Sequence, residues 1–317
     1  MTYVSGGLIQ ATDYNGFAST TAGGNVNYVW NTQYGQTALN TVSTSNLVTA
    51  AQWATLNNTI SSLASHQGTI ITSRTNPAAG EIISVLPHLN TDITNCNTNQ
   101  YNAATHGTQY TAWTGTASKT TATGSGGSAW NITFTDTITF ANTTAASSFF
   151  NAGGLVKIQF SKTSTGTSAD ARWNNFVNNL VGTIYLSSTG ASKYIVGQTY
   201  TGTTKIGGSG TPTVLSTGIG YAQLTSTPNT IYKQFDNGTA YSANYVQLNV
   251  SVSGSVITLT TVWHENGEIY GTNISGGTAT TGITFGTAPT TVVTYFPPET
   301  TYLANVWGTP AIVSSVV

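Results

Sequence analysis

An alternation of apolar and polar residues with a period of two recurs from residue 130 onward and constrains the fold more than any other feature. It recurs at 130–134, at 156–160 and, over its longest stretch, in YVQLNVSVSGSVITLTTVW at 245–263. Successive side chains of a β-strand point to opposite faces, so these runs predict half-buried strands. The last stretch contains two such runs around Ser253-Gly254-Ser255 and therefore predicts a β-hairpin.

Composition supports a sheet-rich fold. Only 5% of the residues are charged, against about 25% in typical soluble domains. The 7 Trp, 16 Tyr and 10 Phe separate the chain from disordered sequences, which lack aromatic residues, and its abundant threonine suits a pleated sheet. We expect a mainly β fold with an α-helical N-terminal region and a C-terminal domain built as an antiparallel β-sandwich or a jelly-roll-like body.

Two long helical patterns lie in the N-terminal region. Apolar residues recur at intervals of three and four in LVTAAQWATLNNTISSLASHQG at 47–68 and in EIISVLPHLNTDITNCNTNQYNA at 81–103, which predicts two amphipathic helices. Pro87 leaves the start of the second helix open, since proline suits a first turn and not a helix interior. Each stripe lasts about two heptads, which favours packing within the chain over an interchain bundle. The stripes are Trp53, Leu56, Ile60 and Leu63, and Ile82, Leu86, Leu89 and Ile93.

The change of period marks a boundary between domains. The Gly-, Ser- and Thr-rich stretch TAWTGTASKTTATGSGGSAWN at 111–131 is typical of a linker or loop. We therefore divide the chain into an N-terminal helical region, 1–110, a linker, 111–131, and a C-terminal β domain, 132–317. One short helix is expected inside the β domain, in ADARWNNFVNNLVG at 169–182.

The charge of the chain argues against several classes of partner, and its cysteine content excludes a disulfide framework. A net charge of -1 cannot neutralise many phosphates, so nucleic acid is not an expected partner. Neither a basic amphipathic stretch nor a long apolar run is found, so no membrane partner is expected, and no signal peptide follows Met1. Cys96 is the only cysteine, which excludes a disulfide framework, and we expect a buried thiol. A nearly neutral surface favours self-association.

No motif for catalysis, cofactor binding or metal binding emerges. Glycoside cleavage needs two carboxylates, and the carboxylates of this chain form no recognisable pair. The stretch HENGE at 264–268 places His264, Glu265 and Glu268 near one another, but Asn-Gly within it indicates a polar hairpin turn rather than a metal site. Asp170 and Arg172 are expected to form a local helix cap and ion pair. The carboxylates are Asp13, Glu81, Asp92, Asp136, Asp170, Asp236, Glu265, Glu268 and Glu299.

Two further features could suggest ligands. Gly153-Gly154 precedes an alternating run and lacks the Lys-Ser/Thr of a phosphate-binding loop, so we expect a bend or bulge where a strand begins. Several loop tyrosines could stack on sugars, although packing across strands is the favoured interpretation. These tyrosines are Tyr194, Tyr200, Tyr221, Tyr232 and Tyr241.

Four quoted segments carry a resemblance to a known group of proteins. They are YVSGGLIQATDYNGFAS at 3–19, VTAAQWATLNNTISSLASHQG at 48–68, FFNAGGLVKIQFSKTSTGTSADARWNNFVNNLVGTIYL at 149–186 and GTAYSANYVQLNVSVSGSVITLTTVW at 238–263. Together they resemble virion structural proteins of tailed bacteriophages, especially phages of aquatic bacteria. These motifs are structural and not catalytic.

The resemblance implies a non-enzymatic part of a virion, in the tail or its fibres, made in the cytoplasm of a bacterial host. It implies other virion proteins as partners, and a homotrimer, as is common among fibre-like parts. The eight residues of the two helical stripes are then the hypothesised docking and oligomerisation residues. Two alternatives stay open: a capsid or neck decoration protein, and a carbohydrate-binding receptor-recognition module that takes a host-surface glycan.

Overall fold

The computed structural model describes residues 10–20, 25–79, 86–104, 111–118, 129–164, 168–190, 193–195, 198–238, 241–266, 269–270, 279–280 and 288–316. Over these residues the chain forms two antiparallel sheets, two short ribbons and several helices, which confirms the mainly β class.

The six-stranded sheet has the order β15-β2-β11-β10-β9-β8. Its centre is the predicted hairpin, in which Ser253 pairs with Val256, and Gly254 turns with a φ of 59° that a side chain would disfavour. The hairpin prediction is confirmed. The strands are β2 (Trp130–Thr139), β8 (Val214–Leu215), β9 (Asn229–Phe235), β10 (Tyr245–Ser253), β11 (Val256–Glu265) and β15 (Ala311–Val316).

The five-stranded sheet has the order β1-β14-β3-β4-β7. Apolar side chains from this sheet, such as Ile158 and Val293, belong to the same buried cluster as Phe134 and Leu248 of the six-stranded sheet. One core therefore serves both sheets. The remaining strands are β1 (Thr111–Ser118), β3 (Leu155–Ser161), β4 (Thr183–Leu186), β7 (Thr203–Ile206), β14 (Thr290–Phe296), and the ribbons β5 (Lys193–Ile195) with β6 (Gln198–Tyr200) and β12 (Ile269–Tyr270) with β13 (Ala279–Thr280).

Strand β1 corrects the predicted linker. Residues 111–118 pair with β14, which lies more than 170 positions later in the chain, and the register shifts between Ala112 and Thr116. Such an irregularity, close to a glycine, hides the alternation on which a strand prediction depends. The linker assignment is therefore wrong over 111–118 and at 130–131, where β2 begins. Residues 119–128 lie outside the described residues, and the domain boundary stays a prediction.

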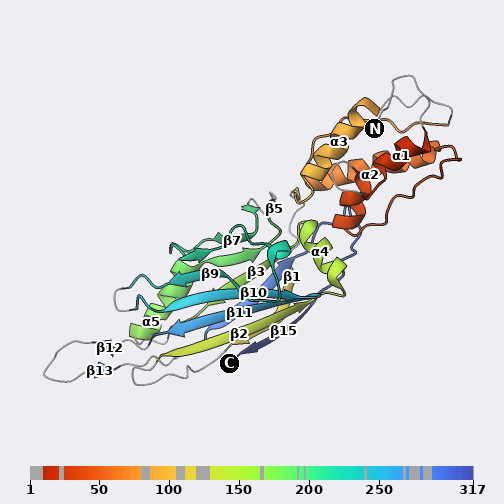
Figure 1. The fold of residues 1–317 in the computed structure, drawn as a ribbon. Helices are drawn as coiled ribbons and strands as arrows, with labels where there is room; N and C mark the ends of the chain where they lie inside the picture. The colour runs from red at the N-terminus through yellow and green to blue at the C-terminus, as the bar shows by residue number, and fades with distance from the viewer. Residues whose placement is uncertain are drawn as a thin grey trace.

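Three helices gather beside the N-terminus, beyond the end of the sheets, and α4 lies between them and the strands (Figure 1). The described helices are α1 (Ala11–Phe17), α2 (Ala50–Gln67), α3 (Leu86–Thr98), α4 (Thr143–Asn151) and α5 (Ser168–Asn175), with π-helical turns η1 (Tyr28–Gln33) and η2 (Phe176–Val181) and the 3-10 turn η3 (Tyr221–Gln223).

Helix α2 has clear end signals. Thr49 and Gln52 form a reciprocal capping box at its start, and Gly68 ends it in the left-handed conformation. The helix therefore begins three residues after Leu47, where the predicted pattern started. In α3, Pro87 falls in the first described turn, the position that proline tolerates. Residues 81–85 of that prediction lie outside the described residues.

The glycine pair at 153–154 joins a helix to a strand. Gly153 has a φ of 102°, and a Cβ on Gly154 would lie 2.5 Å from the ring of Phe149 and 2.6 Å from its carbonyl oxygen. Strand β3 starts at the next residue, Leu155, so the predicted bend before a strand is confirmed. The preceding helix, α4, was not predicted.

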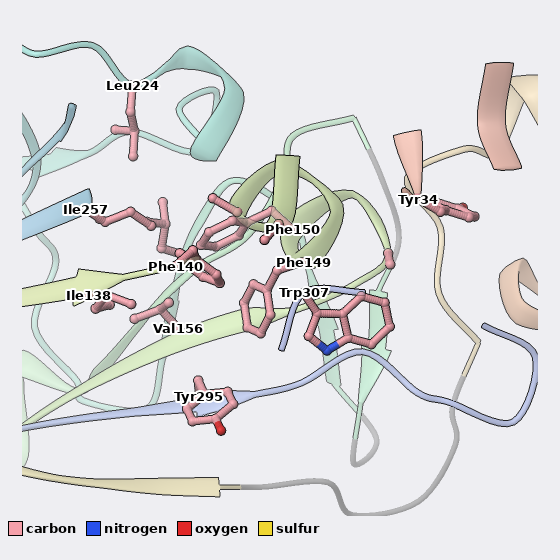
Figure 2. Close-up of a cluster of buried hydrophobic side chains, with 14 of the residues drawn as sticks. Tyr34, Ile138, Phe140, Phe149, Phe150, Val156, Leu224, Ile257, Tyr295 and Trp307 are labelled. Atoms are coloured by element: carbon pink, nitrogen blue, oxygen red, sulfur yellow. The ribbon is translucent and has the colours of Figure 1, made fainter. Parts of the chain in front are cut away.

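Helix α4 contributes two buried phenylalanines, Phe149 and Phe150, to the core. Phe149 lies 5.2 Å from Phe140 and 5.1 Å from Phe150, measured between ring centroids. Figure 2 shows these rings beside Trp307 and between side chains from both sheets. The short predicted helix at 169–182 is likewise confirmed: α5 continues as η2 and ends before Gly182, which has a φ of 78°.

Candidate functional site

Every described side chain of the two predicted docking stripes is buried in the interior of the protein. Trp53 is the centre of the packing: its ring meets those of Tyr14 and Phe17 at centroid distances of 5.6 and 6.3 Å. Ile82 and the side chain of Leu86 lie outside the described residues. The buried residues of the stripes are Trp53, Leu56, Ile60, Leu63, Leu89 and Ile93. A partner that docks on this region would therefore contact other residues.

Exposed apolar side chains lie at the two ends of α2. Leu47 is 89% exposed and Ile70 is 90% exposed, and the helix between them is about 27 Å long at 1.5 Å per residue. The periodicity of the sequence does not distinguish either residue. Leu47 falls within the apolar pattern that predicts the helix, and Ile70 lies beyond the glycine that ends it. They are the better candidates for contact with another protein.

Hydrogen bonds connect the helical region to the rest of the chain. The side-chain amide of Gln36, 3% exposed, donates to the carbonyl of Ala304 at 3.0 Å and accepts from its N–H at 2.9 Å. Asn151 at the end of α4 donates to the side chain of Gln33 at 3.0 Å. These polar contacts join the helices to the C-terminal segment, and Tyr34 and Trp307 also belong to one buried apolar cluster.

A groove of about 560 Å³ lies beside this connection. One wall is the first half of α2 and the other is the segment 36–40, with Ala304 at the junction. None of the side chains that line it is charged. They are Tyr14, Trp30, Gln36, Thr37, Ala38, Leu39, Asn40, Ala51, Gln52, Thr55, Thr59 and Ala304.

Two asparagines hold the segment that forms the second wall. Asn27 donates to the carbonyl of Leu39 at 2.9 Å and accepts from its N–H at 2.7 Å. Asn15 makes the same pair of bonds to Val42, both at 2.7 Å. The N–H and C=O of one residue point the same way only in an extended backbone, so both residues are extended. No sequence signal distinguishes these two asparagines in a chain so rich in Asn.

The described carboxylates all have a partner within the chain. Asp92 pairs with Arg74 and accepts from the N–H of Thr72 at 3.1 Å. The other partners are the Gln10 N–H for Asp13, the Ser314 hydroxyl for Asp136, Lys162 for Asp170, Arg172 for Asp236, Trp173 and Asn244 for Glu265, and the Thr301 N–H for Glu299. Glu81 and Glu268 lie outside the described residues.

The pair His264 and Glu265 belongs to strand β11 and not to a turn, which corrects that part of the hairpin-turn prediction. Glu265 is 2% exposed, and its Oε2 accepts from Trp173 Nε1 and Asn244 Nδ2, both at 2.7 Å. His264 instead stacks on Tyr245 at 4.5 Å, and burial, with a smaller contribution from Lys233, lowers its pKa.

The predicted ion pair between Asp170 and Arg172 is wrong. Asp170 pairs with Lys162, and both side chains are fully buried. Arg172 reaches Asp236, whose Oδ2 accepts from its Nε at 2.8 Å, and its Nη2 donates to the side-chain oxygen of Asn237 at 2.6 Å. Both charges therefore have partners in other elements, because neighbours two positions apart on a helix do not face each other.

The tyrosines considered for sugar stacking mostly serve packing. Tyr221 stacks on Phe150 at 4.5 Å with an interplanar angle of 7°, and the hydroxyl of Tyr232 donates to the Val181 carbonyl at 2.8 Å. Tyr200 is buried and Tyr241 packs against the core. The side chain of Tyr194 lies outside the described residues.

The remaining expectations concern the thiol, metals and membranes. Cys96 is buried, as predicted, and burial raises its pKa to about 12. Among the described residues no three His, Cys, Asp or Glu side chains gather as a metal site. None of the helices in the described residues has the length and apolarity that crossing a membrane requires.

Comparison with known proteins gives no relative: no family model, no characterised protein and no solved structure matches this chain.

Proposed function

We propose that this chain is a non-enzymatic structural component of a bacteriophage virion, in the tail or its fibres, and that it acts as a homotrimer. The observation that carries the proposal is the use of the described carboxylates: each accepts from at least one donor of its own chain, and Oδ2 of Asp136 and Oε2 of Glu299, which lack a donor, are buried. A glycosidase or a metal enzyme instead keeps carboxylates available to substrate or metal.

Within this proposal the sheets form the predicted β-sandwich and the helices form a separate N-terminal domain. The shared buried cluster supports the sandwich, because side chains of the five-stranded and the six-stranded sheet pack into it together. Trp53 of the helical region belongs to the same cluster, so the helical domain packs directly on the β domain. The polar connection at Gln36 and Ala304 supports a helical unit attached to the β domain through specific contacts.

The outer face of β2 and β11 in the six-stranded sheet suits lateral contact with another copy. Threonines alternate with buried residues along β2, and Thr135 and Thr137 lie opposite Thr260 and Thr258 of β11. These four side chains are half-buried and uncharged. A neutral hydroxyl-bearing face lacks the like-charge repulsion that keeps monomers apart.

Locating the chain in the particle tests the proposal. Purified virions of the phage that encodes it would be analysed by quantitative mass spectrometry and by averaged electron-microscope images of particles carrying a labelled copy. We expect a fixed copy number that is a multiple of three, with the label on the tail. Absence from virions would refute the structural role, and a label on the capsid would support the decoration alternative.

The docking role of the helical region can be tested on the exposed ends of α2. We expect Leu47→Asp and Ile70→Asp to reduce incorporation into particles while leaving the thermal unfolding midpoint unchanged, because both side chains are already in water. Ser61→Asp, at an exposed position within α2, is the matched control. Normal incorporation of the double variant would place attachment in the sheets.

A further inference from the structure

We propose that the groove between α2 and residues 36–40 binds an extended, uncharged peptide segment, which adds as a strand along Ala38 and Asn40. The inference rests on the proposed function for the source of the segment, a neighbouring virion protein. The binding chemistry follows from the groove itself.

The first argument concerns unpaired backbone groups. Asn27 binds both the N–H and the carbonyl of Leu39 from one side. In an extended chain the backbone groups of adjacent residues point to the opposite side, so those of Ala38 and Asn40 face away from Asn27. Within the described part of the chain these two residues have no hydrogen bond, and both line the groove. They form a short free strand edge, which can template a further strand.

The second argument concerns the opposite wall. Ala51 and Thr55 are small, exposed residues of α2 that line the groove, so an added backbone can lie between the helix and the strand edge. A segment of about five residues, at about 3.3 Å each, would cover the length of 36–40. The uncharged lining disfavours a charged segment, since a charge placed there would lose hydration without gaining a partner.

Side-chain hydrogen bonds favour a peptide over a sugar. The Trp30 indole N–H already donates to the Thr37 carbonyl at 2.9 Å, and the Thr55 hydroxyl donates to the Ala51 carbonyl at 2.9 Å. The Gln52 side-chain oxygen accepts from the Thr49 N–H at 2.8 Å. A saccharide would compete with these bonds at three of the lining side chains, whereas an added strand needs only the backbone groups of Ala38 and Asn40.

Selection from a random dodecapeptide library, with the purified full-length chain as bait, supplies the probe. A selected peptide is synthesised, and its affinity is measured by titration calorimetry. Asn40→Pro removes one backbone donor and fits the extended backbone at Leu39, which a following proline requires. Asn40→Ala keeps that donor and is its matched control. Thr55→Arg blocks the groove, and Ser61→Arg places the same charge elsewhere on α2.

We expect selected peptides to be poor in charged residues. Their affinity should fall about tenfold or more in Asn40→Pro, through loss of a strand hydrogen bond, and in Thr55→Arg. It should stay within about twofold in Asn40→Ala and Ser61→Arg. Peptide should also slow amide exchange at Ala38 and Asn40. Circular dichroism of each variant separates loss of binding from loss of fold.

Three results would overturn the inference: no peptide is selected, the selected peptides bind equally well to Asn40→Pro and Asn40→Ala, or a panel of neutral oligosaccharides binds the groove and peptides do not. These results are separate from the test of the proposed function. A chain found in the tail whose groove binds no peptide would refute only the docking mode, and a peptide-binding chain absent from virions would refute only the virion role.

Discussion

Gln36 binds both backbone groups of Ala304 with one side-chain amide. The N–H of Ala304 donates to Oε1 at 2.9 Å, and Nε2 donates to the carbonyl at 3.0 Å. The two residues are 268 positions apart, and the contact connects the N-terminal helical part of the chain to the segment that leads into β15. A second bond from Nε2 to the Tyr34 carbonyl, at 3.1 Å, keeps the amide oriented.

Replacing Gln36 should destabilise the chain although no apolar contact is lost. In Gln36→Leu the partly buried backbone groups of Ala304 would lose both hydrogen bonds to the side chain, at a cost of about 0.5–1.5 kcal/mol for each bond. Urea unfolding measures the change, with Thr37→Ala at the exposed next position as control. Equal stability of the two variants would show that water replaces the amide.

Gly154 should not tolerate a side chain. Gly154→Ala would place its Cβ 2.5 Å from the Phe149 ring and 2.6 Å from the Phe149 carbonyl oxygen, so α4 or β3 must shift. We expect a loss of about 1–3 kcal/mol, as for other overpacked sites. Gly218→Ala is the control, because a Cβ there meets nothing within 4 Å. A thermal unfolding midpoint that is equal in both variants would contradict this reading of the helix-to-strand turn.

Glu265 is expected to act in folding and not in catalysis. Glu265→Leu would leave the indole N–H of Trp173 and the amide of Asn244 without their acceptor, at a cost of about 2–4 kcal/mol. Glu265→Gln keeps an acceptor oxygen and should retain more stability than Glu265→Leu. Chemical unfolding followed by tryptophan fluorescence measures both. A polysaccharide-cleaving activity that is present in the native chain and lost in Glu265→Gln would refute the structural role.

Asp136 should make stability fall as pH rises. It lies on the core face of β2 between Phe134 and Ile138, fully buried, and its Oδ1 accepts from Ser314 of β15. Burial raises the pKa of this carboxyl from 3.8 to about 6, and the Ser314 bond opposes the shift. The folded state therefore keeps its proton over a range in which the unfolded state loses it, so ionisation destabilises the fold by up to about 3 kcal/mol.

The measurement is urea unfolding of the native chain and Asp136→Asn between pH 4 and pH 7. The free energies of unfolding of the two proteins should be closest near pH 4. The free energy of unfolding of the variant should then rise relative to that of the native chain up to about pH 6, with no further rise above it. Taking the difference removes the contributions of other titrating groups. A difference that is independent of pH would mean that folding does not raise the pKa of this carboxyl.

The sequence predicts the elements that depend on local signals, and it does not predict those that depend on contacts between residues far apart in the chain. The hairpin of β10 and β11 and the helix α2 were predictable, because alternation, a Ser-Gly-Ser turn and a glycine stop are local signals. Strand β1 was not, since its partner β14 is remote in sequence and its register is irregular. Helix α4 was missed because its apolar residues, in TTAASSFFN, are too few to show a period over two turns.

The candidate sites show the same limit. Periodicity identified the side chains of the two stripes but could not say whether they face a partner or their own chain. The groove depends on Asn15 and Asn27 binding backbone groups 27 and 12 residues away, and any of the many asparagines could have done so. For Asp170 the nearest positive charge in sequence, Arg172, was the wrong partner, because the fold brings Lys162 from the end of β3 to the start of α5.

The buried pair of Lys162 and Asp170 gives the last prediction. Both side chains are fully buried, and Lys162 also donates to the Thr163 carbonyl at 2.9 Å. Removing one charge leaves the other buried without its partner, so Lys162→Met and Asp170→Leu should each cost about 3–5 kcal/mol.

The double variant Lys162→Met/Asp170→Leu removes both charges and should be more stable than either single variant, because neither ion then needs compensation. Guanidinium unfolding of the four proteins completes a double-mutant cycle. If the two single losses simply add in the double variant, the pair makes no mutual contribution, and the attachment of α5 to β3 must depend on the apolar contacts of Trp173 and Phe176.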